Sequence, residues 1–230
     1  MRLFLSLLFL LSGTISFSQN PNSEDIFTKI DSLYREDQFY LGLTYNSLIK
    51  PPEDFSQNGF SIGLSAGFLR DMPVNKSRTV AIAAGFGFSY DKYHQNLVVS
   101  EVNGEKTYTI ENHNSFSNNK LEQVFLDLPL ELRWRNSTPE SHKFWRIYSG
   151  FKLRYLLFDK TKYEGQGVTK KIFNNSDFNE IQYGPYLAFG HNTLNLSVYY
   201  ALNPLFQSAA INGVPINMHN LNFGLMFYIL

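Results

Sequence analysis

The stretch QVFLDLPLELRW, residues 123–134, alternates strictly between two kinds of side chain. One face carries the large apolar residues Val124, Leu126, Leu128, Leu130, Leu132 and Trp134. The other face carries Gln123, Phe125, Asp127, Pro129, Glu131 and Arg133. A period of two is typical of a β-strand, in which successive side chains point to opposite sides. This stretch therefore predicts a strand with one continuous apolar face.

Seven further segments alternate in the same way, so the sequence predicts eight strands. They cover residues 39–45, 60–68, 80–90, 145–157, 181–189, 194–202 and 221–229. Their second faces are mostly glycine, alanine, serine, asparagine and tyrosine, and charges occur only on 123–134 and 145–157. A soluble sandwich or lipocalin-like barrel would instead turn a charged face to water. Long strands with small second-face residues favour a narrow barrel whose apolar face meets lipid.

The connections between these segments alternate between short and long. Short connections cover residues 72–77, 136–143 and 191–192, and long ones cover 46–57, 94–120, 160–179 and 203–218. Outer-membrane barrels have short periplasmic turns and longer extracellular loops. The predicted fold class is thus all-β: an eight-stranded antiparallel up-and-down transmembrane β-barrel. The even strand number predicts that both termini are periplasmic.

The composition excludes several kinds of site. Twenty basic residues balance 20 acidic ones, which argues against nucleic acid as a partner. The absence of cysteine excludes disulfides, thiolate metal sites and a cysteine nucleophile. After the N-terminal region, no run of about 18 apolar residues predicts a transmembrane helix.

The N-terminal sequence MRLFLSLLFLLSGTISFSQ has the features of a secretory signal. A positive Arg2 precedes a short apolar run, and Ser16 and Ser18 precede an expected cleavage before Gln19. The predicted division is a signal peptide (1–18), a periplasmic N-terminal segment (19–37) and the barrel (38–230). Within 19–37, helical spacing of apolar residues predicts a short amphipathic helix over 23–37.

Inward-facing charges form one unusual cluster in the predicted lumen. They come from two neighbouring strands: Asp127, Glu131 and Arg133 from the first, and Arg146, Lys152 and Arg154 from the second. Charges inside a narrow barrel are costly unless they are paired. We therefore expect an ion-pair network that fills and rigidifies the lumen. The alternative is a gated path for small solutes.

Three local features complete the prediction. Trp134 and Trp145 flank one short turn, which predicts a periplasmic aromatic girdle. Asn103-Gly104 lies between alternating runs and predicts a tight hairpin turn. Pro129 and Pro185 lie inside strands, where each removes a backbone donor, so we expect a bulge or a lumen water at each.

The sequence shows no established catalytic, cofactor-binding or metal-binding motif. The five histidines do not stand at ligand spacing from one another or from carboxylates. An enzyme at the outer rim would have to be assembled from His94 or His219 with loop serine and glutamate residues. Such residues occur in any loop, so we expect no enzymatic activity, no cofactor and no metal.

Two strands resemble a known family. FLDLPLELR (125–133) and YSGFKLRYLL (148–157) resemble consecutive strands of the PorT-type outer-membrane barrels of Bacteroidetes. The resemblance covers roughly residues 38–230. It implies an integral protein of the cell outer membrane, in contact with membrane lipid and with other secretion components. The namesake of this family is associated with the type IX secretion system.

The expected function is therefore a structural or accessory subunit of a secretion apparatus. Three alternatives remain from the sequence. One is a surface-binding barrel of the OmpA or OmpX kind, whose long loops bind a partner. The second is a rim-active lipid-modifying enzyme, and the third is a channel for small solutes.

Overall fold

The computed structural model describes residues 37–57, 59–136, 144–165 and 167–229. The predicted signal peptide, the N-terminal helix and most of the 136–143 turn lie outside them. The elements are β1 (Gln38–Ile49), β2 (Ile62–Pro73), β3 (Val80–His94), β4 (Leu97–Val102), β5 (Glu105–Ile110), the 3-10 helix η2 (His113–Ser115), β6 (Asn118–Arg135), β7 (Trp145–Gly165), β8 (Val168–Phe173), β9 (Ile181–His191), β10 (Leu194–Tyr200), β11 (Ala210–Ile211), β12 (Val214–Pro215) and β13 (His219–Ile229). Among the described residues, no helix is long and apolar enough to cross a bilayer.

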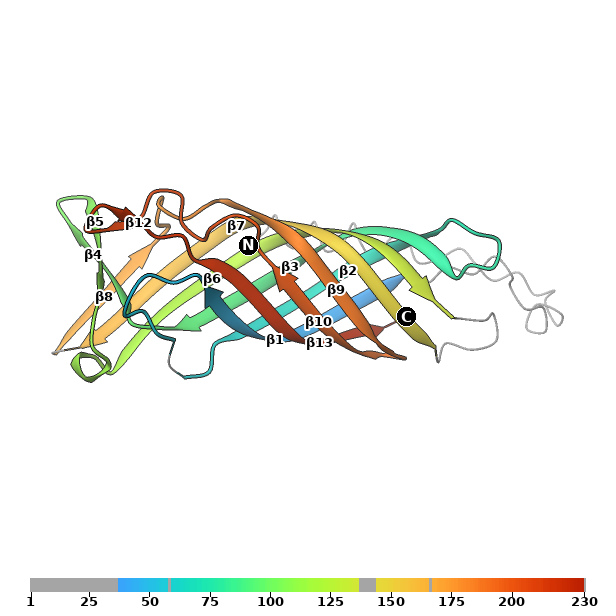
Figure 1. Ribbon diagram of the computed structural model, residues 1–230, viewed down its shortest axis with the longest axis horizontal. Coiled ribbons are helices and arrows are strands. Elements are labelled where there is room, and N and C mark those ends of the chain that lie inside the picture. The colour runs from blue at the N-terminus through green and yellow to red at the C-terminus, as the bar shows by residue number, and fades with distance from the viewer. Residues whose placement is uncertain (1–36, 58, 137–143, 166, 230) are drawn as a thin grey trace, which may run out of the picture. The chain divides into compact units, whose positions relative to one another are not determined.

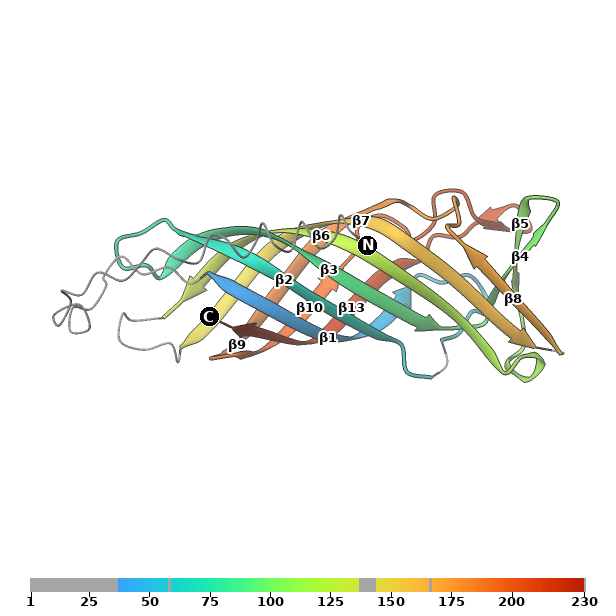
Figure 2. The same cartoon turned by 180° about the vertical axis from the view of Figure 1, so that it is seen from behind.

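Eight of these strands close into an antiparallel barrel (Figures 1 and 2). Around the barrel they follow the order β1, β2, β3, β6, β7, β9, β10 and β13. The last strand returns to the first, with Phe39 opposite Ile229 and Tyr45 opposite Phe223. β8 adds to one end of β7 outside this ring. The predicted eight-stranded barrel is confirmed.

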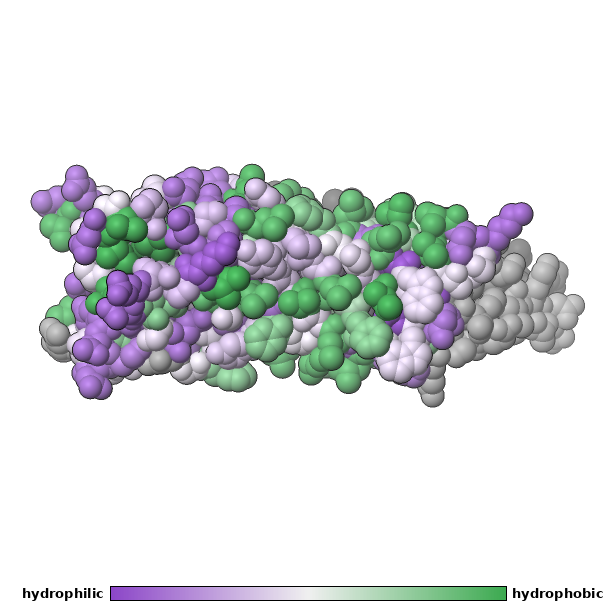
Figure 3. Space-filling model, viewed as in Figure 1, coloured by the Kyte–Doolittle hydropathy of each residue, from purple (hydrophilic) through white to green (hydrophobic). Residues whose placement is uncertain are grey.

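The apolar face of each barrel strand points outward. Leu130 and Leu196 are 54% and 64% exposed, whereas the inward Phe125 and Gln182 are fully buried. In Figure 3, hydrophobic residues gather over the middle of the barrel, and hydrophilic residues gather at the end that carries β4, β5 and β8. We call this outward apolar zone the apolar belt. Its polarity is the inverse of that of a soluble barrel, as the sequence predicts.

Small inward residues make room for large ones. The side chain of Tyr40 lies against Gly67 of β2 and Gly87 of β3. A Cβ atom on Gly67 would lie 2.6 Å from the Tyr40 ring, and one on Gly87 would lie 2.1 Å from the Tyr40 hydroxyl oxygen. The narrow interior of an eight-stranded barrel is thus filled by side chains.

Several strands are longer than the apolar alternation predicts. β6 and β7 pair from Asn118 opposite Glu164 to Arg135 opposite Arg146, well beyond the predicted ranges 123–134 and 145–157. Most of the added positions carry polar side chains, and Leu121 and Phe158 are apolar exceptions. Backbone pairing continues beyond the lipid-facing segment because it does not depend on side-chain polarity.

The bulges expected at the two prolines are absent. The β3–β6 pairing omits the pairs beside Pro129, but its register is the same on both sides, at Ala84↔Leu130 and Gly87↔Asp127. Pro185 pairs with Phe151 in an unbroken β7–β9 register. The register shift of β6 lies instead between Val124 and Phe125. A missing donor interrupts the ladder, but it adds no residue to the strand.

The connections divide the barrel into two ends. The short-turn end carries the β2–β3 and β9–β10 connections, and the second of these has only two residues. The long-loop end carries the β4–β5 hairpin, β8 and the β11–β12 hairpin (Figure 1). The turn at Asn103-Gly104 is confirmed, with φ values of 54° and 82°. A two-residue turn of this type needs positive φ at both positions.

Candidate functional site

The inward-facing side chains of β6 show how the lumen changes along the barrel axis. Starting at the short-turn end, the charged side chains are Arg135, Arg133, Glu131 and Asp127, all of them buried. Nearer the long-loop end the strand presents Gln123 and Leu121, also buried. The interior therefore changes along the axis from charged to polar to apolar.

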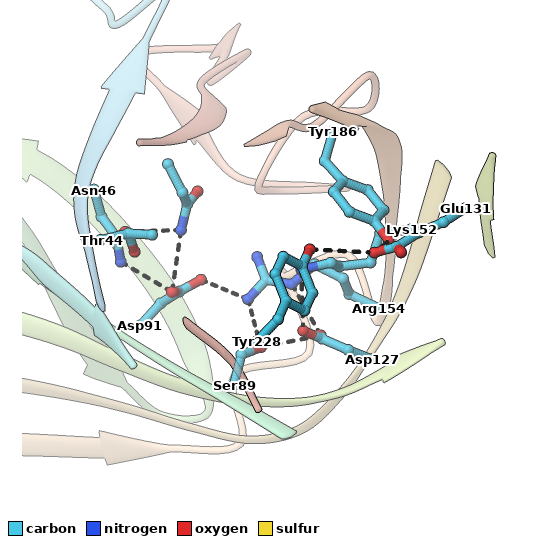
Figure 4. A network of polar contacts seen from close by, with 11 residues as sticks. Thr44, Asn46, Ser89, Asp91, Asp127, Glu131, Lys152, Arg154, Tyr186 and Tyr228 are labelled. Atoms are coloured by element: carbon cyan, nitrogen blue, oxygen red, sulfur yellow. Dashed lines mark hydrogen bonds and ion pairs between the residues drawn. The ribbon is translucent and has the colours of Figure 1, made fainter. Parts of the chain in front are cut away.

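The first charged group is centred on Arg154 of β7 (Figure 4). Its Nη2 donates to Asp91 Oδ2 at 2.7 Å and to Ser89 Oγ at 2.8 Å, and its Nε donates to Asp127 Oδ1 at 3.2 Å. The guanidinium also lies 4.1 Å from the centre of the Phe125 ring. We call Arg154, Ser89, Asp91 and Asp127 the Arg154 cluster. One buried cation thus joins carboxylates from β3 and β6.

Neutral and charged neighbours complete the bonding of these carboxylates. Asn46 Nδ2 and Asn222 Nδ2 donate to Asp91 Oδ1 at 2.9 and 3.2 Å. Lys152 Nζ lies 3.5 Å from Asp127 Oδ2 and 5.2 Å from the centre of the Tyr186 ring. The network therefore draws on strands from opposite sides of the barrel (Figure 4).

The second charged group is centred on Asp71 of β2. Arg135 holds it with two parallel bonds, Nη1 to Oδ1 at 2.9 Å and Nη2 to Oδ2 at 2.8 Å. Arg133 Nη1 donates to Asp71 Oδ1 at 3.1 Å, and Arg133 Nε donates to Glu131 Oε2 at 2.7 Å. We call Asp71, Glu131, Arg133 and Arg135 the Asp71 cluster. The bidentate geometry is the strong form of an arginine–carboxylate pair.

Tyrosines line the space around Glu131. The hydroxyl groups of Tyr186 and Tyr228 donate to Glu131 Oε1. Arg133 lies over the Tyr148 ring at 4.7 Å, and Arg146 lies over the ring of Phe144 at 4.5 Å. Charge–ring contacts of this kind stabilise a desolvated guanidinium.

The structure thus places all six predicted lumen residues inside the barrel, but not in one network across one seam. Asp127 pairs with Lys152 and Arg154 across the β6–β7 seam. Glu131 and Arg133 pair with each other along β6. Arg146 lies over the rings of Phe144, Tyr148 and Tyr228.

Sequence reasoning missed three charged members of the two clusters, namely Asp71, Asp91 and Arg135. Each of them lies just past the end of a predicted strand, at 60–68, 80–90 or 123–134. The alternation could have been continued past the ends of these strands. One more inward position after 80–90 and after 123–134, and two more after 60–68, would have placed all three residues in the lumen.

A small cavity lies beside the Arg154 cluster. Its volume is about 40 Å³, and its lining includes Thr44, Ser65, Lys152, Ser197 and Asn222. That volume admits a few water molecules at most. The lumen at this level is a packed polar core.

Loops close the barrel at the long-loop end. Inward residues of the barrel strands, such as Leu48, Tyr93 and Leu121, form one hydrophobic cluster with loop residues such as Phe178 and Phe206. The last two rings stack with their centres 4.6 Å apart. We call this cluster, together with the loops that supply it, the loop cap. It is an apolar core beyond the apolar belt, which the sequence analysis did not foresee.

A buried carboxylate anchors the loop cap to the barrel wall. The backbone N–H of Asn175 donates to both oxygens of Asp159, at 3.1 and 3.0 Å. Asn175 Nδ2 donates in turn to the hydroxyl of Tyr108, which donates to Asp177 at 2.6 Å. Burial raises the pKa of Asp159 to about 6, and the Asn175 N–H and Lys106 oppose that rise.

We expect the loop cap to become more stable as the pH falls from 7 to 4. The folded-state pKa of Asp159, about 6, exceeds its ordinary value of 3.8, so the folded protein binds the proton more tightly than the unfolded chain. The ionised carboxylate therefore costs stability above about pH 6, and this cost disappears below the ordinary value. Hydrogen exchange of the Asn175 amide, normalised for its intrinsic rate, measures the effect.

Asp159→Asn is the matched control, because the amide oxygen still accepts from Asn175 but carries no charge. The protection of the amide should then lose its dependence on pH in this window. An unchanged slope in the variant would show that another group controls the cap.

The two tryptophans lie on the outside near the short-turn end. Trp134 and Trp145 are about half exposed, at 48% and 50%. Trp145 stacks on Phe189 with 5.5 Å between ring centres and contacts His191 at 5.2 Å. Half-exposed aromatic side chains at one rim are typical of a membrane-interface girdle.

The histidines proposed for the rim-enzyme alternative lie in different settings. His219 is buried, and its Nδ1 lies 3.0 Å from the backbone oxygen of Ala201. His94 is the last residue of β3, on the outward face. Within the described part of the chain, no three histidine, aspartate or glutamate side chains are grouped to hold a metal ion.

The closed barrel, its outward apolar belt and its packed lumen define the class of the protein: a transmembrane β-barrel of the outer-membrane type. A family model described as outer membrane protein beta-barrel domain matches residues 17–207, and the chain belongs to this family. It is therefore an outer-membrane protein. No curated protein matches the sequence significantly.

Proposed function

We propose that this protein is a sealed, non-enzymatic barrel that serves as a structural or accessory subunit of a secretion apparatus in the outer membrane. The observation that carries the proposal is the filled lumen, in which two ion-pair clusters and the loop cap follow one another along the axis. We further propose that the long-loop end is extracellular and that both termini are periplasmic.

A role in type IX secretion is the most specific form of the proposal. It rests on the resemblance of residues 125–133 and 148–157 to PorT-type barrels. Deleting the gene should impair export of proteins that carry the type IX C-terminal signal, and the intact gene should restore it. Normal export in the deletion strain would rule out this role.

A surface-binding barrel is the second candidate. It is favoured by the folded loop cap, whose hairpins present Val102 and Val214 at 64% and 67% exposure. Removing the tip of the β4–β5 hairpin would then abolish partner binding without affecting export. We propose no role as a rim-active enzyme.

A filled lumen predicts that the barrel conducts no steady ion current across a planar bilayer. The purified barrel should give no steady open channel, because side chains fill the interior of an eight-stranded barrel. Single-channel recording measures this directly. Large and stable conductance steps would contradict a sealed barrel and would favour a path for small solutes through the lumen.

A further inference from the structure

Beyond the apolar belt, the outward positions of β3, β6, β7 and β8 change from apolar to basic. One row of cross-strand neighbours contains Lys92, Glu122, Lys160 and Phe173. The next row toward the long-loop end contains His94, Lys120, Lys162 and Lys171. These positions alternate with buried ones such as Tyr93, Leu121 and Thr161, so they face outward. We call the five lysines and His94 the lysine face.

Acidic side chains on the first row and on the row beyond the second balance only part of this charge. Glu122 lies 2.7 Å from Lys120 and 3.5 Å from Lys160, and Glu164 lies 2.6 Å from Lys162. Two glutamates thus face five lysines. Lys120, Lys162 and Lys171 are direct cross-strand neighbours, and like charges in that relation destabilise a sheet. An anion bound between them would remove the repulsion.

The pKa of His94 reflects the positive charge of the neighbouring lysines. Burial, followed by the ammonium groups of Lys92 and Lys120, lowers the pKa of this imidazole, and Glu122 opposes them only in part. A positive neighbourhood penalises a further positive charge. A bound anion would relieve the penalty and raise the pKa of His94.

The position of the lysine face indicates what kind of anion it meets. The row below it contains Tyr90, Val124 and Phe158, which belong to the outward apolar surface. Lysines directly above such a surface can lay their methylene stems along it and extend the ammonium groups into the lipid headgroup layer. A ligand at this height on the barrel wall is part of the membrane surface.

The outward positions of β1, β13 and β10 differ from those of the lysine face. At the same end of β1, β13 and β10, an outward row contains Ser47, Leu221 and Tyr200, which carry no charge. A general attraction to the membrane surface would not need this asymmetry. One localised site explains it better.

We propose that the lysine face binds the phosphate groups of a lipid headgroup in the leaflet that surrounds the long-loop end. Phosphate oxygens would accept from the ammonium groups of Lys120, Lys162 and Lys171, which share no single carboxylate partner in the described part of the chain. This inference requires that the barrel spans the membrane, and it is independent of the secretion role.

The test uses the full chain folded in neutral detergent micelles. Native mass spectrometry measures binding of a bis-phosphorylated glycolipid, its dephosphorylated form and inorganic phosphate. We expect the phosphorylated lipid alone to remain bound, with an affinity that falls as salt rises. The triple variant Lys120→Gln, Lys162→Gln, Lys171→Gln should lose about tenfold in affinity or more. In the wild type, the phosphorylated lipid should also raise the pKa of His94.

Lys50→Gln, Lys76→Gln, Lys170→Gln is the matched control, because it removes the same charge from exposed loop and hairpin positions. This variant should retain the lipid. Heat modifiability on gels verifies that both triple variants are folded. If the variant at Lys120, Lys162 and Lys171 fails to fold, the double variant Lys92→Gln, Lys171→Gln replaces it. Equal binding of the dephosphorylated lipid, equal loss in the control, or complete displacement by inorganic phosphate would overturn the proposal.

Discussion

Replacing Asp71 by asparagine is expected to destabilise the barrel by about 3–5 kcal/mol. The carboxylate is fully buried, and it accepts two bonds from Arg135 and one from Arg133. Without its charge, two guanidinium groups remain in the lumen with Glu131 as the remaining carboxylate of the cluster. Removing one partner of a buried ion pair costs far more than the pair itself contributes, because the other charge stays desolvated.

Urea unfolding in detergent micelles, followed by tryptophan fluorescence, measures this loss. Trp134 lies on β6 beside Arg133 and Arg135, so it reports on the same region. Glu53→Gln is the matched control, because it removes one negative charge from an exposed loop position. A loss at Asp71 below about 1 kcal/mol, as at a surface ion pair, would mean that water reaches this cluster.

Replacing Arg154 by methionine is expected to cost a similar amount, about 3–5 kcal/mol. The side chain donates to Asp91, Ser89 and Asp127, and both carboxylates are almost completely buried. Lys152 remains within 3.5 Å of Asp127, but Asp91 loses its guanidinium partner. The chief cost is therefore the unpaired charge left on Asp91.

Neutralising the whole group tests that reason. The triple variant Arg154→Met, Asp91→Asn, Asp127→Asn should recover most of the lost stability, because no buried carboxylate of the cluster then remains charged. Arg70→Met is the matched control: Arg70 is 54% exposed and pairs with Asp37 at 3.1 Å, so its loss should cost less than about 1 kcal/mol. If the triple variant is no more stable than Arg154→Met, packing rather than charge explains the effect.

The two predictions also distinguish the stability of the barrel from the closure of its lumen. Both clusters lie below the loop cap, which closes the long-loop end with apolar side chains. Loss of the Arg154 cluster should therefore lower stability without opening a channel. This outcome would assign the ion pairs to the rigidity of the barrel and the closure to the cap.

The strand faces were predictable from the sequence because side-chain direction in a strand is local. The alternation of residues 123–134 and 221–229 determines which side chains share a face, whatever their neighbours are. Adjacent strands also meet across a known seam, which brings Asp127 toward Lys152 and Arg154. Asn103-Gly104 is equally local, since two residues with positive φ define the turn.

The partners of the charged residues and the loop cap needed the tertiary structure. Asp71 lies opposite no charged residue of its own hairpin, and its pairing with Arg135 depends on the register of three strands around the barrel. A bulge or a lumen water was predicted at Pro129 and Pro185, and the register of the neighbouring strands shows no bulge at either.

The sequence by itself determined that eight strands turn their apolar sides to lipid, because a period of two is a property of each strand alone. Only the tertiary structure decided which charges meet in the lumen and how the long-loop end is closed. Those contacts join residues far apart in the chain, such as Leu48, Leu121 and Phe206, and their distances depend on the strand register and on the closure of the barrel.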